Sequence, residues 1–390
     1  MKTARFILLC ICSVSVISCS SIAFKEKIEV NEKEDWLLIG SDPERTNISK
    51  STFPLPPPYK LAWKLDADAG FSNNCLSASD GVLFSSTLRG EIFAINIENG
   101  KSLGRITNLG KGAFSAPAIY TGGLIFTFEG DKKNSIINYN VDKGSEIWSR
   151  DIGMSKTSPL LINNMILVSS VSNKVYNLDK TTGNINWVYP AAGTKEETKS
   201  FYTTPTVYGD KVVIGNTNGN IFCLDLNKGY EKWQLKTGGP IYADASVYDS
   251  IIFVGSDDSL FYCIDLDGNI LWKKDLETTY KSSPSFWGDD VIISGIDGIV
   301  YSLNRTTGAI NWKFQTGGAI TASPVIHKDK LFIGSFDMNF YCLDAKNGAQ
   351  LWKFGTEGRI RTTSLVWKDY VFAASEDKNI YCFTPENKFQ

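Results

Sequence analysis

The sequence has one histidine, His327, among its 390 residues. Zinc sites in proteins are built from sets of histidine, cysteine and carboxylate ligands, and the sequence contains neither a Cys-x-x-Cys nor a His-x-x-x-His spacing. It also lacks a Gly-x-Ser-x-Gly nucleophile elbow and a glycine-rich phosphate loop. We therefore expect a protein that is not an enzyme and binds no metal, with His327 as an ordinary strand or turn residue.

An excess of positive charge is also missing. Lysine and arginine together number 40 against 42 acidic residues, which gives a net charge of −2. Proteins that bind a phosphate backbone concentrate lysine and arginine in one segment or on one face, and no segment here does so. We expect no nucleic-acid partner.

The uncharged apolar run at the amino terminus, Phe6 to Ser18, follows Lys2 and Arg5. It is too short to span a membrane and is typical of a secretory signal. The sequence Val16-Ile17-Ser18-Cys19 comes at its end and resembles the lipobox of bacterial lipoproteins, in which the cysteine is acylated by diacylglycerol and becomes the first residue after cleavage. This resemblance implies a lipoprotein that carries fatty acids such as palmitate. The alternative is a plain secretory peptide that is cleaved nearby.

The lipobox resemblance implies three segments. Residues 1–18 are a signal peptide, residues 19–35 are a polar tether that starts at lipidated Cys19, and residues 36–390 form the folded domain. Two of the eight cysteines leave with the signal peptide. Four others occupy one position of successive repeats, where we expect small core residues; disulfides between them stay possible because exported proteins meet oxidising conditions. These four are Cys223, Cys263, Cys342 and Cys382.

Eight copies of a unit of roughly forty residues fill the chain. The clearest copy carries Asp344-x-x-x-Gly348-x-x-x-Trp352, and each copy has four short β-rich runs separated by turn residues. No window shows the spacing of apolar residues that a helix requires. Four antiparallel strands repeated eight times predict an all-β, eight-bladed β-propeller.

The two ends of the chain predict how the ring closes. The last unit stops at Gln390 before its outer strand, and the strand around Trp63 has no unit before it. We predict that this N-terminal strand completes the last blade. Tryptophans within the outer strands are expected to dock each blade against its neighbour, whereas blade one has Gly104 at this position and should dock less firmly. The docking residues are Trp63, Trp148, Trp187, Trp233, Trp272, Trp312 and Trp352.

The repeat resembles the tryptophan-docking motif of the quinoprotein, or PQQ-like, propellers over about residues 36–390. One branch of this family comprises quinoprotein dehydrogenases, which hold PQQ and calcium, usually in longer chains that often carry adjacent cysteines. The other branch, the BamB-type lipoproteins, scaffolds the assembly of outer-membrane β-barrel proteins. The length and the lipobox of this chain favour the second branch, which implies a protein without a cofactor.

The residues three before the proline position of each repeat are predicted to ring one mouth of the channel. Lys156, Lys281 and Arg361 among aromatic residues such as Tyr242 suit an anionic planar ligand, PQQ among them. The alternative is an ordinary solvated rim, which we favour because calcium carboxylates are not evident beside it. The full predicted ring is Ser72, Phe114, Lys156, Tyr202, Tyr242, Lys281, Thr321 and Arg361.

Two further features are candidates for binding. Asp257-Asp258, with Asp265 and Asp267, suggests calcium, although each aspartate falls in a turn where aspartate is common. The connection 190–202 is about six residues longer than its neighbours, and it is either a partner-binding loop or a tolerated insertion. Its candidate contact residues are Lys195, Glu196, Glu197, Lys199, Phe201 and Tyr202.

Together these features predict an outer-membrane lipoprotein that faces the periplasm. We expect a monomer that scaffolds envelope proteins, including the β-barrel assembly machinery, as the BamB resemblance implies. The alternatives are a PQQ-binding or other small-ligand-binding redox propeller, and a propeller with an unrelated binding role, because fold does not dictate function.

Overall fold

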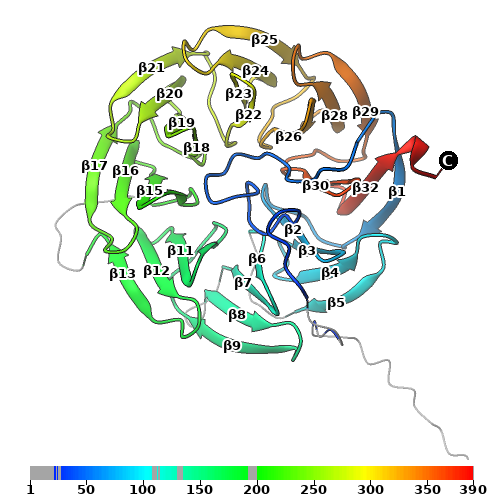
Figure 1. Ribbon diagram of the computed structural model, residues 1–390, viewed down its shortest axis with the longest axis horizontal. Helices are drawn as coiled ribbons and strands as arrows, with labels where there is room; N and C mark the ends of the chain where they lie inside the picture. Colours follow the sequence, from blue (N-terminus) through cyan, green and yellow to red (C-terminus); the bar gives the residue numbers. More distant parts are fainter. Residues whose placement is uncertain are drawn as a thin grey trace, which may run out of the picture.

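The computed structural model describes residues 22, 24, 28–107, 112, 115–129, 135–191 and 200–389. Eight four-stranded antiparallel sheets are arranged radially around a central axis (Figure 1). This arrangement confirms the predicted all-β, eight-bladed propeller. One short 3-10 helix, η1 (Glu386–Phe389), follows the last strand. Within the described ranges, no helix is long and apolar enough to cross a membrane.

Blades one to seven are each built from four consecutive strands, with the innermost strand first. Blade one consists of β2 (Leu76–Ser79), β3 (Val82–Ser86), β4 (Ile92–Asn96) and β5 (Ser102–Ile106), and blade two of β6 (Ala118–Tyr120), β7 (Gly123–Thr127), β8 (Ile136–Asn140) and β9 (Ser145–Arg150). Blade three consists of β10 (Leu160–Ile162), β11 (Met165–Ser170), β12 (Lys174–Asp179) and β13 (Ile185–Tyr189), and blade four of β14 (Thr206–Tyr208), β15 (Lys211–Gly215), β16 (Asn220–Asp225) and β17 (Glu231–Lys236). Blades five to seven consist of β18 (Ser246–Tyr248), β19 (Ile251–Gly255), β20 (Leu260–Asp265) and β21 (Ile270–Asp275); β22 (Ser285–Trp287), β23 (Asp290–Ser294), β24 (Ile299–Asn304) and β25 (Ile310–Gln315); and β26 (Val325–His327), β27 (Lys330–Gly334), β28 (Asn339–Asp344) and β29 (Gln350–Gly355).

Blade eight joins the two ends of the folded chain. Its sheet has the order β1-β32-β31-β30, in which β1 (Tyr59–Asp66) pairs antiparallel with β32 (Asn379–Pro385). The other two strands are β30 (Leu365–Trp367) and β31 (Tyr370–Ala374). Figure 1 shows blue β1 along the outer edge of red β32. The N-terminal strand therefore closes the last blade, as the incomplete first and last units predict.

Burial along the strands follows their position in the blade. The middle strand β27 is buried at four of its five residues, because both of its faces pack against neighbouring blades. The outer strand β29 alternates exposed and partly buried residues. The middle strands therefore contain apolar runs and the outer strands alternate, because only the outer edge of each sheet faces solvent.

Tryptophan docking joins most neighbouring blades. The indole N–H of six tryptophans donates a hydrogen bond to a backbone carbonyl in the outer turn of the next blade. Trp352 packs instead edge-on against Tyr59 and Phe383, with ring centroids 5.1 and 5.2 Å apart. The six hydrogen bonds are Trp63 to Ile97 (2.7 Å), Trp148 to Lys180 (2.8 Å), Trp187 to Leu226 (2.9 Å), Trp233 to Leu266 (2.9 Å), Trp272 to Arg305 (2.9 Å) and Trp312 to Ala345 (3.2 Å).

The Asp and Gly of the repeat shape the turn that receives the indole. The Asp344 carboxylate accepts a hydrogen bond from the Lys346 backbone N–H at 2.8 Å. Gly348 adopts a φ of +73°, and a Cβ atom at this position would lie 2.5 Å from the Trp312 ring. Glycine is needed here both for the left-handed backbone and for the close approach of the indole.

Blade one departs from this pattern as its sequence predicts. Gly104 of β5 pairs with Ala94, at the register position where Trp352 pairs with Cys342 in blade seven. The repeated cysteines are buried opposite the docking tryptophans, as expected of small core residues. Among the five cysteines within the described ranges there is no disulfide, so the alternative of paired cysteines is not supported.

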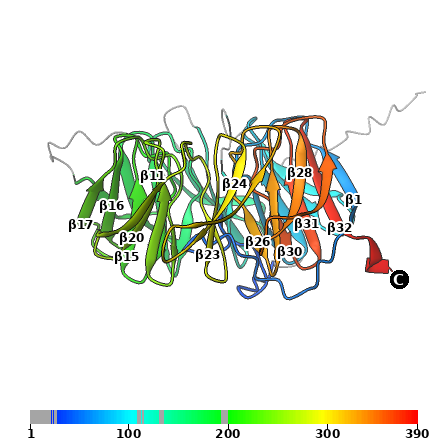
Figure 2. The same cartoon turned by 90° about the horizontal axis from the view of Figure 1, so that it is seen from above.

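The segment 36–58 runs across one face of the ring before it enters β1, and Figure 2 shows this blue segment along that face. Its backbone carbonyls accept hydrogen bonds from the inner strands of four blades, whose inner edges would otherwise face the channel. We call residues 36–58 the entry segment. The four bonds run from the N–H groups of Ile119, Val207, Val247 and Ile326 to the carbonyls of Leu37, Pro43, Glu44 and Asn47.

The structure also changes the expectation for residues 19–35, which we interpreted as a polar tether. Ile22 and Ile28 are buried in an apolar cluster with blades one and two. Asp35 is buried as well, and its carboxylate accepts hydrogen bonds from Trp367 and Ser79. The described part of this segment is therefore bound to the propeller, because its apolar residues find apolar surface there. Cys19 lies outside the described residues.

We expect substitution of Trp63 to destabilise the ring, because this residue lies on the closing strand and also docks blade eight against blade one. Trp63→Ala should lower the free energy of unfolding by about 3–5 kcal/mol. Trp63→Phe, which keeps an aromatic ring but loses the N–H, should cost less. Urea unfolding measures both. Leu61→Ala, at a side chain 40% exposed on the same strand, is the control, and an equal effect of Trp63→Ala and Leu61→Ala would contradict docking.

His327 supplies a pH-dependent prediction. The residue is 1% exposed, its Nε2 lies 2.8 Å from the Phe53 carbonyl of the entry segment, and burial lowers its pKa from 6.5 to about 4. Between these two values the unfolded chain binds a proton that the folded protein does not. The free energy of unfolding should therefore fall as the pH drops from about 6.5 to 4, and this contribution should level off below that range.

His327 is the only histidine in the chain, so NMR titration of the imidazole measures this pKa directly. Urea unfolding at several pH values measures its effect on stability. In His327→Gln the part of the pH dependence between 6.5 and 4 that comes from this group should disappear. A folded-state pKa near 6.5 would show that the imidazole is not buried as described.

Candidate functional site

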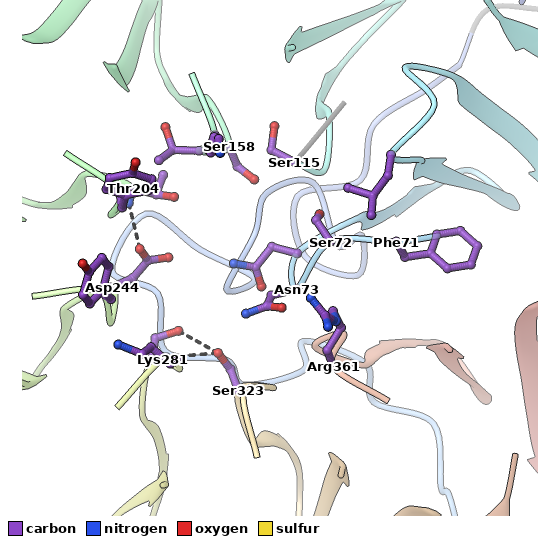
Figure 3. Close-up of a pocket in the computed structure, with 17 residues that line it drawn as sticks. Phe71, Ser72, Asn73, Ser115, Ser158, Thr204, Asp244, Lys281, Ser323 and Arg361 are labelled. Carbon is purple, nitrogen blue, oxygen red and sulfur yellow. Dashed lines mark hydrogen bonds between the residues drawn. The ribbon is translucent and has the colours of Figure 1, made fainter. Parts of the chain in front are cut away.

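The channel mouth holds a cavity of about 280 Å³, lined by residues that precede the inner strands of most blades (Figure 3). These residues lie in the connections between one blade and the next, so the propeller itself brings them together around the axis. The lining residues are Phe71, Ser72, Asn73, Asn74, Leu88, Ser115, Lys156, Thr157, Ser158, Tyr202, Thr204, Tyr242, Asp244, Lys281, Ser283, Ser323 and Arg361.

The predicted ring largely coincides with this lining. Phe114 lies outside the described residues. Thr321 does not line the cavity, and its hydroxyl lies 3.5 Å from the Arg361 carbonyl. The other six residues all line it: Ser72, Lys156, Tyr202, Tyr242, Lys281 and Arg361.

Three cations surround the mouth, and each lies over an aromatic ring. Lys281 Nζ lies 3.9 Å from the centroid of Tyr242, whereas Lys156 Nζ lies 6.0 Å from that of Tyr202. The Arg361 guanidinium lies 5.6 Å from the ring of Phe336. These contacts hold positive charge beside flat apolar surfaces, an arrangement that suits an anionic ligand with a planar group.

Carboxylates already neutralise part of this charge. Lys281 bonds both oxygens of Asp257, at 2.8 and 3.0 Å. Arg361 forms an ion pair with Glu376. A ligand at the mouth would therefore compete with these internal ion pairs, so charge attraction alone would contribute less to its binding free energy.

The floor of the cavity is a buried ion pair. Arg45 of the entry segment is fully buried, and its Nη1 lies 3.4 Å from the Asp244 carboxylate. Arg45 also donates to the Pro205 carbonyl at 3.2 Å, while Asp244 accepts from the Thr204 N–H at 2.7 Å. Burial raises the pKa of Asp244 and lowers that of Arg45, and the opposite charge of each partner counteracts this. The entry segment thus closes one end of the channel.

Hydroxyl groups supply much of the remaining lining. Ser283 and Ser323 share a hydrogen bond at 3.0 Å. Ser158 is 2% exposed, and its hydroxyl has no hydrogen-bond partner in the described part of the chain. Buried hydroxyls are normally paired, so Ser158 leaves one unpaired polar group in the cavity wall.

The acidic residues considered for calcium are occupied by internal contacts. Asp257 binds Lys281, and Asp258 accepts from the Tyr262 hydroxyl at 2.6 Å and the Gly238 N–H at 2.8 Å. The Asp265 carboxylate caps its own turn by accepting from the Asp267 N–H. Throughout the described ranges, no group of three or more His, Cys, Asp or Glu side chains is arranged to hold a metal ion.

The structure describes only part of the connection 190–202. Lys195, Glu196, Glu197 and Lys199 lie outside the described residues. The expectation that Phe201 is a partner contact is wrong, because its side chain is 0% exposed and packs on Phe222 with centroids 6.0 Å apart. Its aromatic ring fills the core beside blade four. Tyr202 is 39% exposed and packs on Tyr242, so it remains available at the mouth.

Some residues of the site carry no signal in the sequence. Asp244 and Ser158 belong to ordinary positions of their repeats, and Arg45 lies about 200 residues before its partner Asp244. Only the ring geometry brings Arg45 to the channel floor. A second cavity of about 560 Å³ lies between the entry segment and blades two and three, lined in part by Leu37, Leu38, Ile119 and Leu161.

The radial sheets, the tryptophan docking and the repeat define a PQQ-like β-propeller. A family model described as outer membrane protein assembly factor BamB matches residues 60–152, 89–246 and 236–383. The chain belongs to this family.

Individual proteins are similar to this chain at low sequence identity. Outer membrane protein assembly factor BamB of Shewanella oneidensis is 23% identical over 252 residues, which is 58% of this chain and 62% of that protein. The matching region thus spans less than two thirds of this relative. The crystal structure of BamB from Moraxella catarrhalis superposes with a TM-score of 0.69 at 17% identity, over 84% of this chain and all of that one.

Enzymes share the fold. Quinohemoprotein alcohol dehydrogenase from Comamonas testosteroni superposes with a TM-score of 0.77 at 12% identity, over 93% of this chain and 82% of that one. At such low identity the structural similarity establishes the fold alone, and it does not separate a scaffold from a dehydrogenase.

Proposed function

We propose that this protein is a lipid-anchored scaffold of the cell envelope that contributes to outer-membrane β-barrel protein assembly. Membership of the BamB family is the observation that carries this proposal. In this proposal Cys19 is the lipidation site, the propeller faces the periplasm, and the protein is a monomer that binds the β-barrel assembly machinery.

The structure supports a scaffold role through its rigidity. Ring closure by β1 and docking between blades hold the connecting loops on a fixed frame, and loops on such frames commonly carry binding contacts. At the channel mouth Tyr202 is exposed beside the long connection that precedes it. Exposed tyrosines are frequent anchors in protein interfaces, so we place the partner surface at this side of the ring.

Capture of envelope proteins tests the scaffold. We expect the tagged protein to retain components of the β-barrel assembly machinery from membranes, and we expect deletion of residues 195–200 or Tyr202→Ala to weaken this capture. Tyr230→Ala is the control, because Tyr230 is 53% exposed in the outer turn of blade four, away from the mouth. Circular dichroism checks that each variant is folded.

The outcomes separate two claims. If the unaltered protein captures no component of the machinery, the scaffold proposal is wrong. If it captures them and neither change at the mouth reduces the yield, the scaffold stands and the position of the partner surface is wrong.

A second candidate is a small-ligand or redox role at the channel mouth. The observation that favours it is the combination of Lys156, Lys281 and Arg361, each over an aromatic ring, with the unpaired hydroxyl of Ser158. An anionic planar ligand of the PQQ class suits this wall. The described residues supply no carboxylate cluster for an accompanying calcium ion, so the cations would have to hold such a ligand themselves.

Titration with PQQ, with and without calcium, tests this candidate. If the mouth binds the ligand, the melting temperature should rise, the ligand absorbance should change, and Lys281→Met should weaken binding by roughly tenfold. Lys328→Met is the control, because Lys328 bonds the Thr52 carbonyl of the entry segment and does not line the cavity. No change in either signal at high ligand concentration would remove the candidate.

A further inference from the structure

The seam between blades one and two lacks the tryptophan that docks most other pairs of blades. At this seam the outer strand of blade one carries Gly104, paired with Ala94. An indole at this position would fill the space between the blades and donate its N–H to the carbonyl that follows the motif Asp or Asn of the next blade. In blade two the motif residue is Asn140, so the carbonyl left to be satisfied belongs to Val141.

The amino-terminal segment supplies the missing donor. The backbone N–H of Phe24 donates to the Val141 carbonyl at 2.9 Å. This carbonyl is equivalent by its place in the repeat to those of Lys180 and Ala345, which accept from Trp148 and Trp312. A main-chain N–H thus makes the hydrogen bond that an indole makes at six other seams.

The same segment supplies the missing apolar surface. Phe24 packs edge-on against Phe84 of blade one, with ring centroids 6.5 Å apart. Ile22 is fully buried, and its carbonyl accepts a hydrogen bond from the Tyr139 hydroxyl of blade two at 3.1 Å. The segment therefore contacts both blades, and Ile22 and Ile28 share one apolar cluster with residues of the two blades.

The contacts continue after Phe24. The Gly122 N–H of blade two donates to the Ile28 carbonyl at 3.3 Å, and the Glu29 N–H donates to the Asp80 carboxylate of blade one at 3.2 Å. We call the described residues 22, 24 and 28–30 the strap. Its hydrogen bonds reach turns on both sides of the seam, so the strap crosses from one blade to the other.

We propose that the strap takes the place of the docking tryptophan between blades one and two, and that it thereby holds this edge of the ring against a lipid bilayer. The second half rests on the proposed lipid anchor. Cys19 precedes Ile22 by three residues, and an extended chain of that length spans roughly 10 Å. An acylated Cys19 would therefore keep the blade one to blade two edge close to the membrane, instead of letting the propeller move freely on a tether.

Hydrogen exchange and thermal melting of the full-length protein test the seam. We expect Phe24→Ala to increase exchange selectively in peptides that contain Phe84 and Val141, and to lower the melting temperature by a few degrees. Phe53→Ala, at a side chain 40% exposed on the entry segment, is the control and should change neither signal.

One result of this experiment would overturn the strap. Unchanged exchange at the seam in Phe24→Ala would show that the segment does not support it.

A milder variant avoids dependence on a single substitution. Tyr139→Phe removes only the hydroxyl that donates to Ile22, so trypsin should cleave faster after Lys25 and Lys27. Tyr208→Phe, which removes a hydroxyl bonded to Ser250 in distant blades, should leave that rate unchanged. An equal cleavage rate in Tyr139→Phe and the unaltered protein would contradict the strap.

Fluorescence quenching tests the orientation. Lys143→Cys and Thr307→Cys place a label at the same exposed position of the outer turn in blades two and six, on opposite sides of the ring. The native cysteines of the folded domain are buried, so they should not compete for the label. In liposomes that contain spin-labelled lipid, we expect stronger quenching at residue 143 than at residue 307.

Equal quenching at the two positions would overturn the orientation. Mass spectrometry of the amino-terminal peptide separates this failure from failure of the proposed function. If Cys19 carries no lipid, the anchor is wrong, whereas the exchange experiment still decides whether the strap replaces the tryptophan.

Discussion

Docking of each blade against the next is the interaction on which the rest of the structure depends. A four-stranded sheet with two apolar faces is stable only when both faces are covered. Here the indole of one outer strand lies over the glycine of the next outer turn and donates to the carbonyl beside it, as Trp312 does at Gly348 and Ala345. The same contact repeated around an axis sets the position of every connecting loop, including those that form the channel mouth.

The amino-terminal part of the chain acts where this repeated contact is incomplete. β1 supplies the strand that the last blade lacks, the entry segment satisfies inner strand edges and places Arg45 under the channel, and the strap lies at the seam without a tryptophan. The described part of residues 19–35, which we expected to be a polar tether, thus packs on the ring. The ring also keeps a mouth with several cations and an unpaired hydroxyl, which a scaffold role alone does not require.

Much of the fold was predictable from the sequence, because the same pattern of strand and turn residues occurs in eight successive units. The turn motif around Asp344 and Gly348, the closing strand around Trp63 and the substitution at Gly104 could all be placed from spacing alone. Six of the eight predicted mouth residues line the cavity, since their positions are equivalent within the repeat. Phe201 was misjudged because a sequence does not show whether an aromatic residue in a loop points outward or into the core.

The sequence by itself determined the number of blades, the way the ring closes and the family. Each of these follows from periodic residues whose effects are local: a turn, a strand or an indole beside its neighbour. Only the tertiary structure decided that Arg45 meets Asp244 and that Phe24 meets Val141. Such contacts join residues more than a hundred positions apart, and they depend on where the closed ring leaves unpaired backbone groups, which no local pattern in the chain encodes.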